Sequence, residues 1–179
     1  MHETPEGERI RIVDISPETL PRLEALHVAE VDGFNDLGLD PRRPVPEDAF
    51  VDGRMRTDRR GVFFIERKAD GAIVGSIQYN RVSYGPGDES QAWMIGIGLF
   101  PDARGQGIGT EAQRVFTAWL FETTDVNRVE ASTDVENMAE ARSLEKAGFT
   151  REGIVRGAQF RAGAYHDLVL FAKLRSDPR

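Results

Sequence analysis

The segment with the clearest chemical meaning is RGQGIGT, residues 104–110, which lies between a β-rich run and an amphipathic helical pattern. Glycines allow a tight turn and let a ligand approach the backbone amides without interference from a Cβ atom. A helix that begins here adds unbonded N–H groups and a partial positive charge, both of which favour an anion. Arg104 adds a full positive charge at the edge of the loop. The segment therefore predicts a binding site for a phosphate-bearing ligand.

Two common phosphate-binding motifs do not fit the spacing of this loop. A Walker loop requires Gly-Lys-Ser/Thr, whereas Gly107 is followed by Ile-Gly-Thr. A dinucleotide fingerprint requires G-x-G-x-x-G near the start of a βαβ unit, whereas the spacing here is G-x-G-x-G and other β-rich runs precede it. The R-x-x-G-x-G loop of acyl-CoA transferases matches at Arg104, Gly107 and Gly109. A glycine-rich turn without any ligand is the alternative.

The elements that must position this loop follow from the hydrophobic pattern. Period-2 and β-rich runs predict strands over 9–15, 62–68, 72–79, 91–100, 127–133, 150–157 and 166–174. Helical periodicity and capping residues predict helices over 17–31, 47–59, 107–121 and 137–147, the last closed by Gly148. This order predicts an α/β (α+β) domain in which a mixed sheet packs against helices.

Composition limits the class of protein. The 179 residues suit a single domain, 1–179, with an ordered core over about 8–174. Lys and Arg total 23 and Asp and Glu total 30, and this net charge of −7 argues against a nucleic-acid partner. The absence of cysteine excludes disulfides, Cys-zinc sites and thiol nucleophiles. We find no apolar run of membrane-spanning length and no signal peptide, so we expect a cytoplasmic protein with no membrane partner.

Three segments carry a more specific pattern when they are taken in order. They are LFPDARGQGIGTEA (99–112), VEASTDVENMAEARSLEKAGF (129–149) and REGIVRGAQFRAGAYHDLVLFAKL (151–174). Together they resemble the GNAT acyltransferase superfamily, and within it the branch that acetylates the N-terminal alanine or serine of ribosomal proteins. The resemblance implies a central, mostly antiparallel sheet of about seven strands, flanked by about four helices, with the fourth and fifth strands splayed to hold CoA.

The resemblance also implies an activity and its partners. The chain is expected to be an N-acetyltransferase that moves an acetyl group from acetyl-CoA to a primary amine by direct attack in a ternary complex, without a metal. The amine is either a protein N-terminus or a small molecule, and a homodimer is left open. A different class of function, an acyl-CoA-binding sensor or scaffold with little turnover, is the alternative.

Cofactor-binding roles carry over from the resemblance one residue at a time. Backbone amides of the loop are expected to bind the CoA pyrophosphate: Arg104, Gly105, Gln106, Gly107, Ile108, Gly109 and Thr110. Main-chain groups of Leu99 and Phe100 are expected to pair with the pantetheine amides and hold the thioester carbonyl. The Asn137 side chain is expected to contact the pantetheine arm or a phosphate, with a plain helix N-cap as the alternative.

The chain departs from the family pattern at the residues that would transfer protons. Relatives often have a Tyr and a Glu where this chain has Leu144 and Met94. Catalysis then depends mainly on proximity and orientation, which supply roughly 7–11 kcal/mol. The remaining candidates for proton transfer are Asp134, Ser143 and Tyr165, of which Asp134 also fits a turn at a strand end and Tyr165 also fits cross-strand packing.

The acceptor pocket is assigned by analogy alone. We expect the first helix and the loops 34–46 and 84–90 to form it, with Phe34, Asn35, Tyr84 and Trp93 as lining residues. His166 has the opposite strand parity from its neighbours Tyr165 and Asp167, so we expect it to point away from whatever they face.

Overall fold

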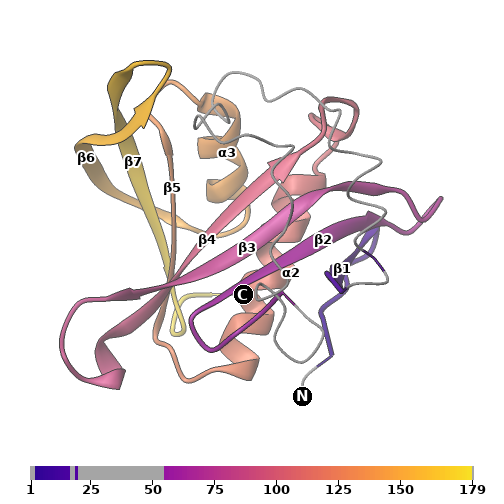
Figure 1. The fold of residues 1–179 in the computed structure, drawn as a ribbon, viewed down its shortest axis with the longest axis horizontal. Coiled ribbons are helices and arrows are strands. Elements are labelled where there is room, and N and C mark those ends of the chain that lie inside the picture. Colours follow the sequence, from indigo (N-terminus) through magenta and orange to yellow (C-terminus); the bar gives the residue numbers. More distant parts are fainter. Residues whose placement is uncertain (1–2, 17–18, 20–54, 179) are drawn as a thin grey trace.

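Seven strands form one sheet in the computed structural model, which describes residues 3–16, 19 and 55–178 (Figure 1). The strand order is β1-β2-β3-β4-β5-β7-β6, and every neighbouring pair is antiparallel except β4 with β5. The strands are β1 (Ile10–Asp14), β2 (Arg60–Arg67), β3 (Ile73–Ser83), β4 (Gln91–Leu99), β5 (Arg128–Asp134), β6 (Thr150–Arg161) and β7 (Ala164–Leu174). The helices are α2 (Ile108–Thr123) and α3 (Met138–Lys146), with short 3-10 turns η3 (Asp88–Ser90) and η4 (Pro101–Ala103). The predicted mixed α/β fold is confirmed.

The parallel pair β4 and β5 separates after a short contact. The two strands are paired only from Trp93–Val129 to Ile95–Ala131. Beyond Ile95, β4 continues along β3 to Leu99, while β5 continues along β7 to Asp134. The strands therefore diverge toward their C-terminal ends, as the predicted splay requires.

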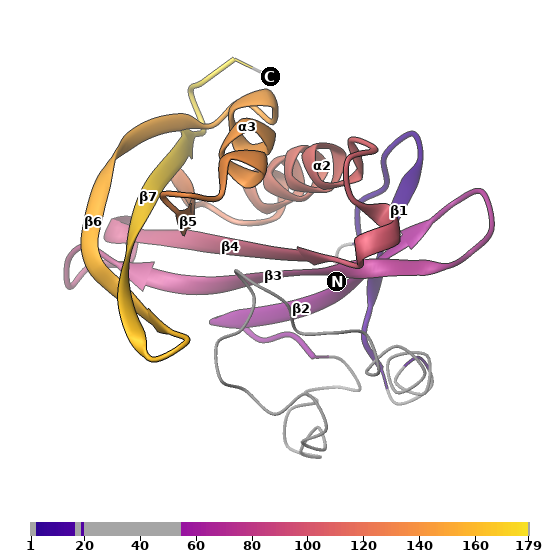
Figure 2. The ribbon, with the colours of Figure 1, turned by 90° about the horizontal axis from the view of Figure 1, so that it is seen from above.

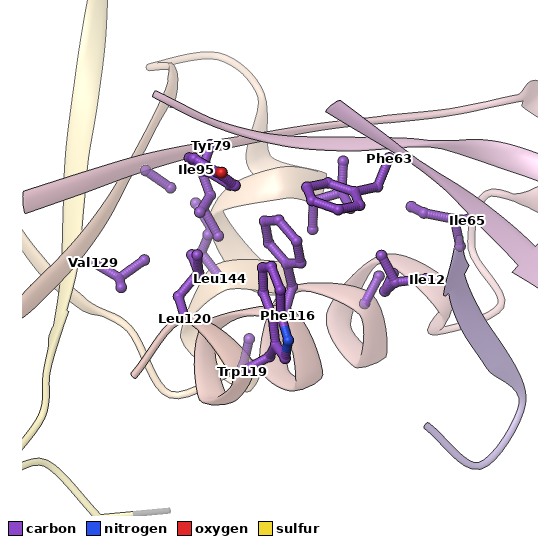
Figure 3. Packing of buried hydrophobic residues seen from close by; sticks show 14 of the residues in the cluster. Ile12, Phe63, Ile65, Tyr79, Ile95, Phe116, Trp119, Leu120, Val129 and Leu144 are labelled. Carbon is purple, nitrogen blue, oxygen red and sulfur yellow. The ribbon is translucent and has the colours of Figure 1, made fainter. Parts of the chain in front are cut away.

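Both helices lie on the same face of the sheet, where they cover the main hydrophobic core (Figure 2). Alternate residues of β2 point to opposite faces, so Phe63 and Ile65 enter this core while Phe64 enters a smaller cluster on the other face. Phe116 and Trp119 project from α2 toward Phe63 at the centre of the core (Figure 3). This packing fixes α2, and with it the loop that precedes α2, against the sheet.

Both ends of α3 carry the caps that the sequence predicts. Asn137 accepts a hydrogen bond from the Glu140 N–H at 3.2 Å, which is the usual N-cap contact. Gly148 follows α3 with a φ of +91°, and the Phe149 N–H donates to the Leu144 carbonyl, so the predicted glycine cap is confirmed. Within the described part of the chain, neither helix is long and apolar enough to cross a membrane.

Two of the predicted helices, 17–31 and 47–59, fall mostly outside the described residues. The described end of the second, residues 55–59, is not helical, so the predicted boundary at Arg59 is wrong. Thr57 Oγ1 accepts from the backbone N–H groups of Arg59 and Arg60, which gives the chain a local turn in place of helical bonds. At the start of the predicted helix 17–31, Ser16 Oγ accepts from the Thr19 N–H, and Thr19 Oγ1 accepts from the Ser16 N–H.

We expect Phe116→Ala to lower the free energy of unfolding by about 3–5 kcal/mol, because the ring is fully buried against other aromatic rings. The same substitution at Phe160, which is 59% exposed, is expected to lower it by less than about 1 kcal/mol. Urea unfolding followed by circular dichroism measures both values. Equal losses in the two variants would contradict the assigned core.

Candidate functional site

The glycine loop presents a row of backbone N–H groups that have no partner in the part of the chain that the structure describes. Gly105 and Gly107 have φ angles of +72° and +77°, a conformation that favours glycine. No acceptor among the described residues receives a hydrogen bond from any backbone N–H between Gly105 and Thr110. The same N–H groups stand at the N-terminus of α2, whose dipole adds a partial positive charge. Such an arrangement suits an anion, as the sequence predicts.

A residue from the first strand region holds this loop in place. The Arg9 guanidinium donates to the Gln106 carbonyl at 2.7 Å and, through Nε, to the Glu111 carboxylate at 2.8 Å. The Arg9 backbone N–H also donates to Glu111 at 2.8 Å. Burial favours a higher pKa for Glu111, but these hydrogen bonds from Arg9 outweigh it and lower the pKa of the carboxyl. Arg9 and Glu111 therefore form an ionised clamp that joins the loop to the sheet.

A pocket of about 520 Å³, here called the loop pocket, lies between the glycine loop and α3. Its lining combines the open glycines with the cations Arg104, Arg142 and Lys146, and it also includes Asn137 and the acidic Glu140. Arg104 Nε also donates to the Leu99 carbonyl at 3.0 Å, which holds its side chain over the end of β4. A positive pocket in a chain of net charge −7 is suited to a strongly anionic ligand.

A second pocket of about 340 Å³, here called the strand pocket, fills the space where β4 and β5 separate. The Phe100 N–H donates to the Val74 carbonyl at 3.0 Å, so this group is bonded to β3 and is not available to a ligand. Hydrogen-bonding directions alternate along an antiparallel pair, so the backbone groups of Ile97 and Leu99 face the other way, into the split. The family resemblance implies this contact for Leu99 and Phe100, whereas the structure offers the Ile97 backbone groups and the Leu99 N–H.

The far end of the strand pocket is closed by an ion pair. Arg161 donates to the buried Asp134 carboxylate at 2.6 Å, and His166 Nδ1 lies 3.3 Å from the same carboxylate. Burial favours a higher pKa for Asp134, but the Glu136 N–H and the Arg161 guanidinium lower the net pKa below its ordinary value. An ionised carboxylate that accepts two hydrogen bonds is a weak base. This geometry therefore favours a structural role for Asp134, in which it ties the β6–β7 hairpin to β5.

The other proton-transfer candidates lie in different places. Ser143 lines the loop pocket, where its Oγ donates to Gln113 at 3.0 Å and contacts Thr110 Oγ1 at 3.0 Å. Tyr165 is 74% exposed and packs edge-on against Phe160, and it lines neither pocket. His166 points to the opposite side of the strand from Tyr165, as predicted. It is therefore the His166 ring, and not Tyr165, that faces Asp134.

The predicted acceptor residues are not brought together in the described structure. Trp93 lies where β4 is still paired with β5, so its side chain is buried in the main core and not in the split between the strands. Its Nε1 donates to Thr124. Tyr84 donates to the buried Glu130 at 2.7 Å, at the end of the sheet where β4 and β5 begin. Neither lines a pocket described here. Phe34 and Asn35 lie outside the described residues.

Sequence reasoning missed several groups that line the pockets. Arg142 and Lys146 are four residues apart on α3, so their common helical face was available as a signal. Glu140 follows the capping Asn137 by three residues and lines both pockets. Arg9 had no local signal, because its partner Glu111 is 102 residues away in the chain.

Comparisons with known proteins agree with this arrangement. The family model described as "Acetyltransferase (GNAT) domain" matches residues 9–150. The chain is 32% identical to the probable N-acetyltransferase YjcK of Bacillus subtilis (strain 168), over 69% of this chain and 67% of that protein. It is 29% identical to the putative ribosomal N-acetyltransferase YdaF of the same strain, over 60% of this chain and 57% of YdaF.

A solved structure has a similar fold over nearly the whole chain. It is the ribosomal L7/L12 α-N-protein acetyltransferase RimL in complex with coenzyme A. The two share 19% sequence identity with a TM-score of 0.75, over 97% of this chain and 98% of RimL.

We expect Glu111→Gln to lower the free energy of unfolding at pH 7 by about 1.5–3 kcal/mol, because the clamp loses its charge-assisted hydrogen bonds. Since folding lowers the pKa of Glu111, the stabilisation is present above the unfolded-state pKa and disappears as the pH falls through the folded-state pKa. Urea unfolding at pH 7 and at successively lower pH should therefore show the two proteins converging. Glu122→Gln, exposed on the same helix, is the control, and a gap that stays constant with pH would refute the clamp.

Proposed function

The chain belongs to the GNAT acetyltransferase family, and from that premise we propose that it transfers the acetyl group of acetyl-CoA to a primary amine. The observation that carries this proposal is the row of N–H groups from Gly105 to Thr110, which have no partner among the described residues and lie beside a positive pocket. Hydrogen-bond donors at a helix N-terminus fit the pyrophosphate of CoA. When bound, acetyl-CoA supplies the activated acyl group.

The residues of the two pockets support separate parts of the cosubstrate. Arg104, Arg142 and Lys146 would hold the phosphates by charge, and Asn137 lies beside them in the loop pocket. The Ile97 backbone groups and the Leu99 N–H offer a strand edge to the extended, amide-containing pantetheine arm, while the Leu99 carbonyl is bonded to Arg104. The N–H groups of that edge can also polarise a carbonyl that lies between the strands.

The strand pocket is the proposed meeting point of the acyl group and the amine. Its lining is polar but contains a neutralised ion pair, with Gln78, Ser132 and Gln159 as uncharged hydrogen-bonding groups beside it. Such a lining can orient an uncharged amine, the reactive form in acyl transfer. Holding the amine and the acyl group in a reactive geometry lowers the activation barrier, because the entropy cost of bringing them together is met on binding.

Peptide N-termini are the first acceptors to test, because YdaF and RimL are named as acetyltransferases of ribosomal proteins. Small amines form the second arm of the screen. Release of free thiol from acetyl-CoA with either class supports the proposed reaction and excludes the non-catalytic acyl-CoA sensor. Calorimetric titration that detects no acetyl-CoA binding at millimolar concentration would overturn the proposal.

We expect Gly107→Ala to weaken acetyl-CoA binding about tenfold or more. An alanine at φ +77° is strained by about 1–2 kcal/mol, and its Cβ would lie 3.2 Å from the Arg9 guanidinium, so the loop must shift. Gly163→Ala is the matched control, because Gly163 also has a positive φ, +82°, but lies in the β6–β7 turn with open space around it. Calorimetry should give wild-type affinity for the control. Equal affinity in both variants would refute the loop as the phosphate site.

A further inference from the structure

Glu140 lies where the two pockets meet. The residues that line both the loop pocket and the strand pocket are Ile97, Gly98 and Glu140. If the phosphates of acetyl-CoA occupy the first pocket and the acyl group the second, the pantetheine arm must cross this junction. The thioester at the end of the arm then lies in the strand pocket, which Glu140 also lines. Glu140 is the one titratable residue, among those that the structure describes, that faces both sides of it.

A chain of hydrogen bonds orients the Glu140 carboxyl from behind. Ser143 Oγ donates to Gln113 Oε1 at 3.0 Å, which fixes the direction of the buried Gln113 amide. The other end of that amide, Nε2, donates to Glu140 Oε1. The Glu140 backbone N–H is held in turn by Asn137 Oδ1. The carboxyl is therefore anchored to α2 through one oxygen, while its residue faces both pockets.

The surroundings of Glu140 favour proton exchange near neutral pH. Burial raises the pKa of Glu140 to about 7, and the hydrogen bond from Gln113 opposes this by a smaller amount. The charged groups that line the same space are Asp134 and Arg161 from β5 and β6, which pair with each other. The cations of the loop pocket complete the set: Arg104, just after η4, and Arg142 and Lys146 from α3. A carboxyl with this pKa is populated in both its acidic and basic forms at the pH of the cell.

We propose that Glu140 is the group that transfers the proton in acetyl transfer, an inference that rests on the proposed function. As the amine nitrogen bonds to the acyl carbon, the C–S bond breaks and its electron pair stays on sulfur. Glu140 gives its proton to that sulfur, and the surplus proton of the nitrogen returns to the Glu140 carboxylate through water. The products are the amide and free thiol, and Glu140 regains its starting form. Glu140 thus takes the place left by Leu144 and Met94, which have no ionisable side chain.

Glu140→Gln tests this role, because the amide keeps an oxygen that can accept from Gln113 but cannot titrate. We expect acetyl-CoA affinity within about threefold of wild type and a fall in kcat of about 100-fold or more, with loss of the pH dependence near pH 7. Glu140→Asp, which keeps the carboxyl, should recover part of the rate. Glu145→Gln, exposed on the same helix, should behave as wild type.

A measurement that does not depend on turnover accompanies the kinetics. Carbon-13 NMR of glutamate-labelled protein should show one carboxyl that titrates near pH 7, shifts when free CoA is added, and is missing in Glu140→Gln. A Glu140→Gln variant with wild-type kcat and pH profile would overturn the role, as would a variant that loses acetyl-CoA affinity while its kcat is unchanged. Failure of the wild-type protein to bind acetyl-CoA would overturn the proposed function itself, and this inference with it.

Discussion

The separation of β4 from β5 is the constraint on which the rest of the site depends. Each strand is committed to its other neighbour, β4 to β3 and β5 to β7, so the parallel ladder between them stops at Ile95 and Ala131. The Leu99 carbonyl accepts from Arg104 Nε, whereas the Ile97 backbone groups and the Leu99 N–H that would have continued this ladder must find other partners. An extended ligand with amide groups can provide them, and it is held in one orientation by doing so.

The second requirement is that the split stays open at a fixed width. The helix side of the sheet is filled by α2 and α3, whose contact includes the pair Gln113 and Glu140. The end of β5 is tied to the β6–β7 hairpin by Asp134 and Arg161, so it is held away from β4 by a charged contact that is itself buried. Separating such a pair leaves a buried charge without its partner, and this cost in free energy keeps β5 and the hairpin in a fixed arrangement. The groups that form the pocket between the strands therefore also stabilise the fold.

Local patterns in the sequence were enough to predict the order of elements and the position of the glycine loop. Strand alternation, the cap at Asn137 and the glycine at Gly148 are short-range signals that depend on neighbouring residues. Contacts between distant segments leave no such signal, and this is why the Asp134–Arg161 pair could not be foreseen. The assignment of Trp93 to a pocket failed for a related reason, because strand parity does not reveal where a neighbouring strand departs.

The clamp between Arg9 and Glu111 has a consequence for how the protein is made. The glycine loop is locally encoded, yet its shape depends on a strand that leaves the ribosome about a hundred residues before it. Long-range contacts of this kind form late and slow the folding of the whole chain. During synthesis, the Arg9 side chain therefore cannot form this clamp until α2 has been made. A sequence change near Arg9 that speeds premature pairing would deplete competent enzyme without touching a single ligand contact.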